Sequence, residues 1–211
     1  MFQRVTESNQ DEFFSSIDDA IAYAESAKKS MMRYKAFISR LRSFDIKGKY
    51  LEIGAGPGVL TVEIARNFPE VEITALELSS DMVTVGQKYV AENKFDNRIT
   101  FVVGDAHDEK LLHSLGEFDL VYSTYSLHHW VNPKNAIVNL HSAVQKGGML
   151  YIFDLRRVWW LYWIPIKNGF FNSIRASYLP HEIELMFRGM DIQNTEIHRE
   201  FPFIQSAFVK K

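Results

Sequence analysis

The sequence predicts an α/β fold, in which strands alternate with helices along the chain. The run KYLEIGAGPGVLTVEIARNF, residues 49–68, has the pattern of a short apolar strand, a glycine turn and an amphipathic helix. Further strand-like apolar runs follow, each separated from the next by a helix-like stretch. The tail then carries consecutive strand patterns. Alternating β and α units followed by consecutive β elements are typical of this fold class.

Composition limits the class of protein. The chain has 211 residues, a formal net charge of -2 and no cysteine. This length most simply forms one domain, and the near-neutral charge argues against DNA or RNA as the main partner. Without cysteine, disulfides, thiolate metal sites and a cysteine nucleophile are excluded, which fits the cytoplasm. The sequence shows no signal-peptide core and no apolar run near ~18 residues, so we expect no transmembrane segment.

The N-terminal region has a helical pattern. From Phe13 to Leu41, apolar residues recur at steps of three and four, which indicates one long helix or two shorter ones. Ser16 and Asp19 have the spacing of a box-like N-cap. The opposite face is basic, and we interpret it as a solvated surface, with a lid or an anionic-substrate contact as the alternative. The basic residues are Lys28, Lys29, Arg33, Lys35, Arg40 and Arg42.

The turn after the first strand predicts a nucleotide-cofactor site. Gly54, Gly56 and Gly58 can adopt positive φ, and without a Cβ they let a ligand lie against backbone N–H groups at the helix N-terminus. A dinucleotide fingerprint would require its third glycine at position 59, which is Val59. Glu52, two residues before the first glycine, is a further departure from that fingerprint. The spacing therefore disfavours a nicotinamide-dependent dehydrogenase.

Two acidic residues follow at the ends of the next strands. Glu77 lies at the end of the strand predicted over residues 71–78, where a carboxylate can accept hydrogen bonds from both ribose hydroxyls. Asp105 ends the strand predicted over residues 99–105, near the expected position of an adenine. A solvated acid is the alternative for Glu77, and the N-cap of a helix near residues 107–114 is the alternative for Asp105. Their order after the glycine turn favours cofactor binding.

The second half of the chain carries a more specific pattern. A strand predicted over residues 118–123 leads into TYSLHHW, and Pro133 lies in the first turn of the helix that follows. KGG then precedes a fifth strand that ends near Asp154. Together with the E-x-G-x-G-x-G turn, this half resembles the Rossmann-like, or class I, methyltransferases that depend on S-adenosyl-L-methionine (SAM), and within them the type 11 domain. The resemblance covers residues 49–154.

The resemblance implies a fold, a cofactor and a set of binding residues. The fold is a three-layer sandwich whose seven-stranded, mostly parallel sheet ends in a C-terminal antiparallel hairpin. Residues 181–190 have a helical pattern and residues 191–200 and 201–211 have strand patterns, which supports that ending. The implied cofactor is SAM, with S-adenosylhomocysteine as product. The implied cofactor-binding residues are Glu52, Gly54, Ala55, Gly56, Gly58, Glu77, Leu78, Asp105, Ala106 and Ser123.

His128 and His129 are the candidate catalytic residues. Neutral imidazole titrates near working pH, so either residue could take a proton from the methyl acceptor. A packing or cofactor-supporting role is the alternative, because membership of a motif does not assign a role. Adjacent histidines without an accompanying acid cluster do not define a metal site, and we expect no metal.

The segment after the fifth strand should differ between substrates. Residues 158–171 are dense in aromatic side chains, and three interpretations compete: a cover over an apolar or flat acceptor, a dimer or membrane-surface contact, and core packing. The apolar run within it is too short to span a bilayer. The candidate substrate-binding residues are Asp154, Arg156, Trp160 and Tyr178.

These observations predict a single SAM-dependent methyltransferase domain. Its expected parts are an N-terminal helical lid (1–45), a cofactor-binding core (46–154), an aromatic substrate-side insert (155–180) and a C-terminal helix with hairpin (181–211). The expected activity is methyl transfer to a small-molecule acceptor by a cytoplasmic monomer or homodimer. A non-catalytic SAM-binding accessory protein is the main alternative, and a nicotinamide-dependent dehydrogenase is a weaker one.

Overall fold

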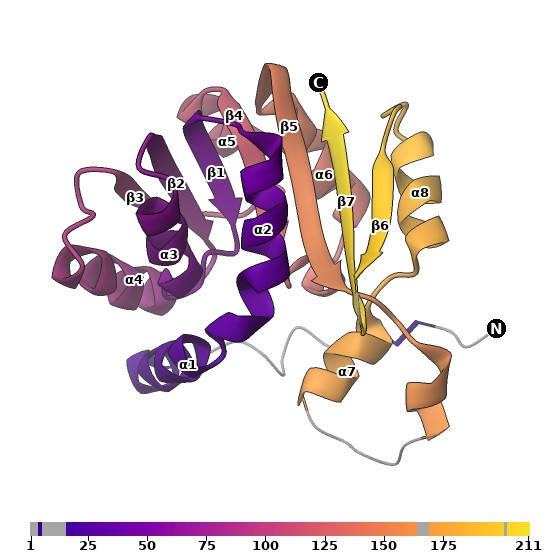
Figure 1. Cartoon of the computed structure of the whole chain (residues 1–211), viewed down its shortest axis with the longest axis horizontal. Helices are drawn as coiled ribbons and strands as arrows, with labels where there is room; N and C mark the ends of the chain where they lie inside the picture. Colours follow the sequence, from indigo (N-terminus) through magenta and orange to yellow (C-terminus); the bar gives the residue numbers. More distant parts are fainter. Residues whose placement is uncertain (1–3, 6–15, 164–168, 201) are drawn as a thin grey trace.

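The computed structural model describes residues 4–5, 16–163, 169–200 and 202–211. Its centre is a seven-stranded sheet in the order β3-β2-β1-β4-β5-β7-β6 (Figure 1). Strands β1 to β5 are parallel, whereas β7 runs antiparallel to both β5 and β6. The predicted seven-stranded sheet with a C-terminal antiparallel hairpin is therefore confirmed. The strands are β1 (Gly48–Ile53), β2 (Val71–Glu77), β3 (Ile99–Val103), β4 (Phe118–Thr124), β5 (Val144–Leu155), β6 (Glu196–Glu200) and β7 (Ile204–Lys210).

Helices cover both faces of the sheet (Figure 1). One core contains Val62 of α3 and Val83 of α4, and the other contains Ile137 of α6 and Phe187 of α8. Successive strand residues enter opposite cores, as the alternating pleat requires. The helices are α1 (Ile17–Lys29), α2 (Lys35–Phe44), α3 (Val59–Asn67), α4 (Ser80–Glu92), α5 (Glu109–Leu115), α6 (Pro133–Ser142), α7 (Gly169–Ala176) and α8 (Pro180–Arg188), with 3-10 turns η1 (Met31–Tyr34), η2 (Leu127–His129) and η3 (Trp159–Trp163).

The predicted N-terminal helix is two helices. Ser16 caps α1 by accepting a hydrogen bond from the N–H of Asp19 at 3.2 Å, as its spacing predicts. The 3-10 turn η1 then separates α1 from α2. Phe37 of α2 is fully buried and stacks on Tyr151 of β5 with ring centroids 5.1 Å apart, which anchors α2 to the sheet. Phe13, where the predicted helix begins, lies outside the described residues.

Most other helix starts follow the predicted local signals. Ser79 caps α4, and Asn132 caps α6 with Pro133 in its first turn. At α8, Leu179 supplies no side-chain cap, but the Glu182 carboxylate accepts a hydrogen bond from its backbone N–H at 2.8 Å. The sixth strand is shorter than the predicted 191–200 and begins at Glu196, because Asp191 and Asn194 adopt left-handed backbone conformations.

The strand order creates a crevice at one edge of the sheet. Chain connections run from β1 outward to β2 and β3, and then return past β1 to β4 and β5. The loops after β1 and β4 therefore diverge at the carboxyl ends of adjacent strands, where open α/β sheets bind ligands. The described helices include none that is long and apolar enough to cross a membrane.

Candidate functional site

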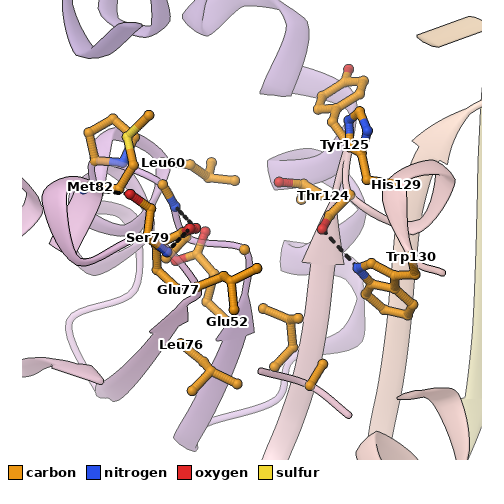
Figure 2. A pocket seen from close by; sticks show the side chains of 18 of the residues that line it. Glu52, Leu60, Leu76, Glu77, Ser79, Met82, Thr124, Tyr125, His129 and Trp130 are labelled. Atoms are coloured by element: carbon orange, nitrogen blue, oxygen red, sulfur yellow. Dashed lines mark hydrogen bonds between the residues drawn. The ribbon is translucent and has the colours of Figure 1, made fainter. Parts of the chain in front are cut away.

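A cavity of about 700 Å³ lies at the carboxyl ends of β1, β2 and β4. One wall carries Glu52, Glu77 and Ser79, and the facing wall carries Tyr125 and His129 (Figure 2). This volume is typical of a site for a cofactor or another small molecule. Of the ten predicted cofactor residues, eight line the cavity: Glu52, Gly54, Ala55, Gly56, Glu77, Leu78, Asp105 and Ala106.

Gly58 and Ser123 are not among the lining residues. Gly58 is the N-cap of α3, with a φ of 73°, and a Cβ there would stand 2.9 Å from the ring of Phe101. Ser123 lies at the buried end of β4, and its hydroxyl has no hydrogen-bond partner among the described residues. Gly58 therefore packs against Phe101, and Ser123 is buried within the sheet.

The glycine turn shapes the cavity through its missing side chains. Gly54 and Gly56 have φ of 70° and 54°, and a Cβ on Gly54 would stand 2.8 Å from the Ser126 hydroxyl. The sequence predicts that the N–H groups of this turn bind a ligand, but those of Gly54 and Ala55 already donate to Leu76 O. Val59 and Leu60 follow in the first turn of α3. Their N–H groups have no described hydrogen-bond partner, and both residues line the cavity.

Glu77 connects the glycine turn to the next helix. Its Oε2 accepts a hydrogen bond from Gly56 N at 2.9 Å, and its Oε1 accepts one from Ser79 N at 2.9 Å (Figure 2). The Ser79 hydroxyl in turn accepts from Met82 N in the first turn of α4. One carboxylate thus fixes the positions of β2, the glycine turn and α4 while facing the cavity.

Glu52 is a buried acid in the cavity wall. It is 2% exposed, and its Oε2 forms no hydrogen bond with any described residue. Burial raises the pKa of this carboxyl to about 7, and the neighbouring hydroxyls of Thr61 and Tyr122 lower it by less than burial raises it. The Glu52 carboxyl therefore changes charge near neutral pH, unlike an ordinary glutamate.

Asp105 and His107 form a polar corner of the cavity. The Asp105 Oδ1 atom accepts from His107 N at 2.9 Å and lies 2.6 Å from His107 Nδ1. The other ring nitrogen, Nε2, lies 3.1 Å from the carbonyl oxygen of Asn132. The alternative in which Asp105 caps the next helix is wrong, because Asp108 caps α5 through Leu111 N.

Tyr125 holds a strained backbone on the opposite wall. Its φ is 52°, which is unusual for a bulky residue, and Tyr125 N donates to Phe153 O at 2.8 Å. Its hydroxyl donates to Arg33 O at 3.2 Å, and its ring meets Tyr34 edge-on at 5.4 Å. The N-terminal region is thereby tied to the loop after β4. Burial raises the pKa of Tyr34 to about 12 and also raises the pKa of Tyr125, so both stay protonated at neutral pH.

The two candidate catalytic histidines have different environments. His129 lines the cavity beside Tyr125 (Figure 2). His128 is 3% exposed and does not line it. The His128 Nδ1 atom lies 2.7 Å from Asp154 Oδ1, and His128 N donates to Asp154 Oδ2 at 3.0 Å. The rings of His128 and His129 are 3.9 Å apart, so the buried histidine supports the one that faces the cavity.

The predicted substrate residues lie away from the cavity lining. Asp154 is buried against His128, and Tyr178 lies under the guanidinium of Arg4 at 4.2 Å. Arg156 donates to the carbonyl oxygen of Pro202, between β6 and β7. Trp160 is 42% exposed. Gly169 and Asn172 of α7 line the cavity instead.

Core packing is the wrong interpretation for the tryptophans of the aromatic segment. Trp159 and Trp163 are 66% and 74% exposed, whereas Leu161 between them is 1% exposed and belongs to a small core with Val158 and Ile174. Leu161 thus forms the buried side of η3 together with Val158 just before it, and the tryptophans face outward. Side chains of residues 164–168 lie outside the described part of the chain.

Several lining residues were not predicted from the sequence. Tyr23, Tyr34, Trp130 and Asn172 all line the cavity. The helical periodicity assigns Tyr34 to an apolar face but cannot show that this face meets a ligand site. Trp130 belongs to the TYSLHHW turn, and its indole donates to the Ser126 hydroxyl at 3.0 Å. Asn172 carries no local sequence signal.

Comparison with known proteins agrees with this architecture. Residues 51–148 match the family model described as a methyltransferase domain. Residues 51–148 therefore resemble a methyltransferase domain. The matched residues run from within β1 into β5, and they include the glycine turn, Glu77, Asp105 and both histidines.

Individual relatives of this domain are distant. The demethylmenaquinone methyltransferase of Porphyromonas gingivalis is 29% identical over 150 residues, which cover 64% of this chain and 60% of that protein. The structure of a SAM-dependent methyltransferase from Aquifex aeolicus superimposes with a TM-score of 0.70, at 11% identity, over 92% of this chain and 97% of that one. The structure of human N-acetylserotonin methyltransferase in complex with SAM gives a TM-score of 0.71 at 15% identity, over 97% of this chain and 60% of that one. These structural likenesses show the fold.

Among the described residues, the structure contains no group of three or more His, Asp or Glu side chains that could hold a metal ion.

Proposed function

We propose that this protein transfers the methyl group of SAM to a small-molecule acceptor. The observation that carries the proposal is the single cavity wall formed by the glycine turn, Glu77 and Asp105, which faces a second wall with Tyr125 and His129. The methyltransferase family match of residues 51–148 and the SAM-bound structural relative support the same reading. The cysteine-free sequence is compatible with a cytoplasmic enzyme.

The residues of the first wall fit SAM. Gly54 and Gly56 line the cavity without a Cβ, so a ligand can lie against their backbone, and Glu52 offers a buried carboxyl oxygen with no described partner. A carboxylate at this position suits the ammonium of the methionyl part. We assign the ribose to Glu77 and the adenine edge to Asp105 and Ala106. The N–H groups of Val59 and Leu60 suit the methionyl carboxylate, because both lie at the positive end of α3.

The second wall would position the acceptor. SAM, when bound, supplies a methyl group that its sulfonium already activates. The chain then has to align the acceptor behind that group, and alignment alone can contribute about 7 to 11 kcal/mol to lowering the barrier. Tyr34 and Tyr125 present ring edges, and the Tyr34 hydroxyl keeps a proton to donate, which suits a planar, oxygen-bearing acceptor. Gly169 and Asn172 of α7 close this side.

We assign the proton-accepting role to His129. Because His128 is buried against Asp154, His129 is the histidine of the pair that an acceptor could touch. A positioned imidazole typically contributes about 10²- to 10⁴-fold when the acceptor must lose a proton. The matched relative of Porphyromonas gingivalis is named for action on demethylmenaquinone. We therefore propose a phenol, quinol or similar ring as the acceptor class for this chain.

The chain spans 60% of the length of that relative, so its complete activity needs a direct test. The purified protein is incubated with radiolabelled SAM and a panel of phenols, naphthoquinols and carboxylic acids. We expect label transfer to ring acceptors, and His129→Gln should reduce kcat at least about tenfold while SAM affinity stays unchanged. His181→Gln, on α8, is the matched control. SAM binding without transfer to any acceptor would instead favour the accessory-protein alternative.

A further inference from the structure

Four large aromatic side chains face outward beside the cavity. Trp159, Trp160 and Trp163 of η3 and Phe170 of α7 are each 42% to 74% exposed. We call these four residues the aromatic patch. Monomeric soluble proteins seldom gather such side chains at one place on the surface unless the place contacts a partner. The patch begins four residues after the end of β5, on the side of the molecule where the parallel strands end (Figure 1).

Buried contacts of neighbouring residues hold η3 in place, so that its tryptophans face outward. Leu161 and Val158 pack with Ile174 of α7, and the Arg175 guanidinium donates to Leu161 O at 3.2 Å. Because Leu161 and Val158 already fill the core beneath η3, Trp159 and Trp163 are surface residues and not misplaced core residues.

A pair of arginines lies next to the patch. Arg156 N donates to Phe203 O at 2.7 Å, and the Phe203 ring contacts that of Phe170 with centroids 5.7 Å apart. In the sheet, Arg199 of β6 pairs with Gln205 of β7, which in turn pairs with Asp154 of β5, two residues before Arg156. Because alternate residues of a strand share a face, this register places both arginines on the same side of the hairpin. Neither arginine forms an ion pair with a described carboxylate, and Arg156 Nε has no described hydrogen-bond partner.

No acidic side chain balances this charge nearby in the sequence. From Leu155 to His181 the chain contains no Asp or Glu, although the whole protein has a net charge of -2. The carboxylate of Glu200, next to Arg199 on β6, pairs with Arg40 at 2.9 Å. Alternating strand residues point to opposite faces, so that pair lies on the other side of β6. The patch and its rim are therefore aromatic and cationic.

We propose that the aromatic patch, with Arg156 and Arg199, docks the protein on the surface of an anionic lipid bilayer. Tryptophan favours the boundary between headgroups and acyl chains, and arginine side chains reach anionic headgroups from such a position. A second copy of the chain is a poorer occupant, because a two-fold contact would bring the same arginine pair from each copy together.

The location of the patch connects it to the proposed function. Phe170 of the patch is flanked on α7 by the cavity-lining residues Gly169 and Asn172. If the methyltransferase activity proposed above is correct, docking would place the cavity mouth at the membrane surface. An apolar acceptor dissolved in the bilayer could then enter without crossing water. This consequence rests on the proposed function, whereas the docking itself does not.

Vesicle sedimentation of the full chain tests the docking. We expect the protein to sediment with phosphatidylcholine vesicles that contain phosphatidylglycerol, and to bind vesicles of phosphatidylcholine alone, or anionic vesicles at high salt, much more weakly. Trp159→Ala with Trp163→Ala should weaken partitioning at least about tenfold. Arg156→Gln with Arg199→Gln should weaken it by about fivefold for each charge removed. Leu185→Ala and Arg188→Gln on α8, also exposed, are the matched controls.

Two further measurements distinguish loss of membrane docking from a folding defect and from dimer formation. Titration with SAM should give the same affinity for the Trp159/Trp163 double variant as for the original protein, so that a folding defect is recognised. Light scattering after size exclusion reports the oligomeric state. Failure to sediment with anionic vesicles at low salt, or equal losses in the α8 controls, would overturn the proposal. A dimer that the tryptophan variant dissociates would assign the patch to a second copy. Absence of methyl transfer alone would count against the proposed function and not against docking.

Discussion

The Nδ1 atom of His128 lies 2.7 Å from the Oδ1 atom of Asp154, and both side chains are at least 97% buried. The same carboxylate also accepts hydrogen bonds from His128 N and Leu155 N. It therefore joins the end of β5 to the turn that carries the histidine pair. Its neighbour His129, which is half-buried and lines the cavity, depends on this connection for its position.

Asp154→Asn should destabilise the fold, because an amide group cannot accept all of these hydrogen bonds and would place a donor against a donor. We expect the free energy of unfolding to fall by about 2 to 4 kcal/mol, measured by urea denaturation. Asp191→Asn is the matched control, since Asp191 is exposed in a loop with left-handed backbone that asparagine also adopts. Equal stability of the two variants would contradict this role for Asp154.

Gly54→Ala should weaken SAM binding in addition to straining the backbone. Gly54 and Gly147 have φ of 70° and 86°, so alanine at either position costs about 1 to 2 kcal/mol of backbone strain. A Cβ at Gly54 also meets the Ser126 hydroxyl at 2.8 Å, whereas one at Gly147 meets nothing within 4 Å. We expect both variants to lose stability in thermal melts, and Gly54→Ala alone to lose SAM affinity in calorimetric titration. A similar affinity loss in Gly147→Ala would mean that the effect is global.

Glu52→Gln should change how stability depends on pH. The folded-state pKa of Glu52 is about 7, above its ordinary 4.5, so between these values the folded protein holds a proton that the unfolded chain releases. The contribution of Glu52 to the free energy of unfolding therefore falls as pH rises from about 4.5 to 7 and stays low above that. Relative to the original protein, Glu52→Gln should gain about 2 to 3 kcal/mol between pH 5 and pH 8.

Urea denaturation at both pH values measures this change. Glu72→Gln, on the exposed side of the neighbouring strand β2, is the control. A stability difference between Glu52→Gln and the original protein that is the same at both pH values would show that the Glu52 carboxyl ionises normally.

Glu77→Ala should weaken SAM binding at least about tenfold, because it removes the proposed ribose acceptor and the hydrogen bonds to Gly56 N and Ser79 N. Ser79→Ala is the control for local disruption, since it removes the cap of α4 but leaves the Glu77 carboxylate and both of its backbone hydrogen bonds. We expect a much smaller change in affinity for Ser79→Ala, measured by the same calorimetric titration. Unchanged affinity in Glu77→Ala would remove Glu77 from the site.

The parts of the structure set by local interactions could be predicted from the sequence. Ser16, Ser79 and Asn132 cap helices next to themselves in the chain, and the glycine turn with Glu77 follows from strand ends that meet at one sheet edge. The seven-stranded sheet and its hairpin were confirmed, because family resemblance and strand patterning agreed.

Features that depend on distant contacts could not be predicted. The neighbours His128 and His129 have the same local signal, and only the carboxylate of Asp154 on β5 determines which of them is buried. Tyr125 is fixed in its strained backbone by Phe153 and Arg33, which lie far from it in the sequence. The exposure of Trp159 likewise follows from Leu161 filling the small core beside α7.

The most direct test of the central claim is calorimetric titration of the purified protein with SAM, S-adenosylhomocysteine and NAD in parallel. We expect micromolar binding of the first two compounds and no heat of binding with NAD. Binding of NAD alone would contradict the assignment of the glycine turn, Glu77 and Asp105 to SAM.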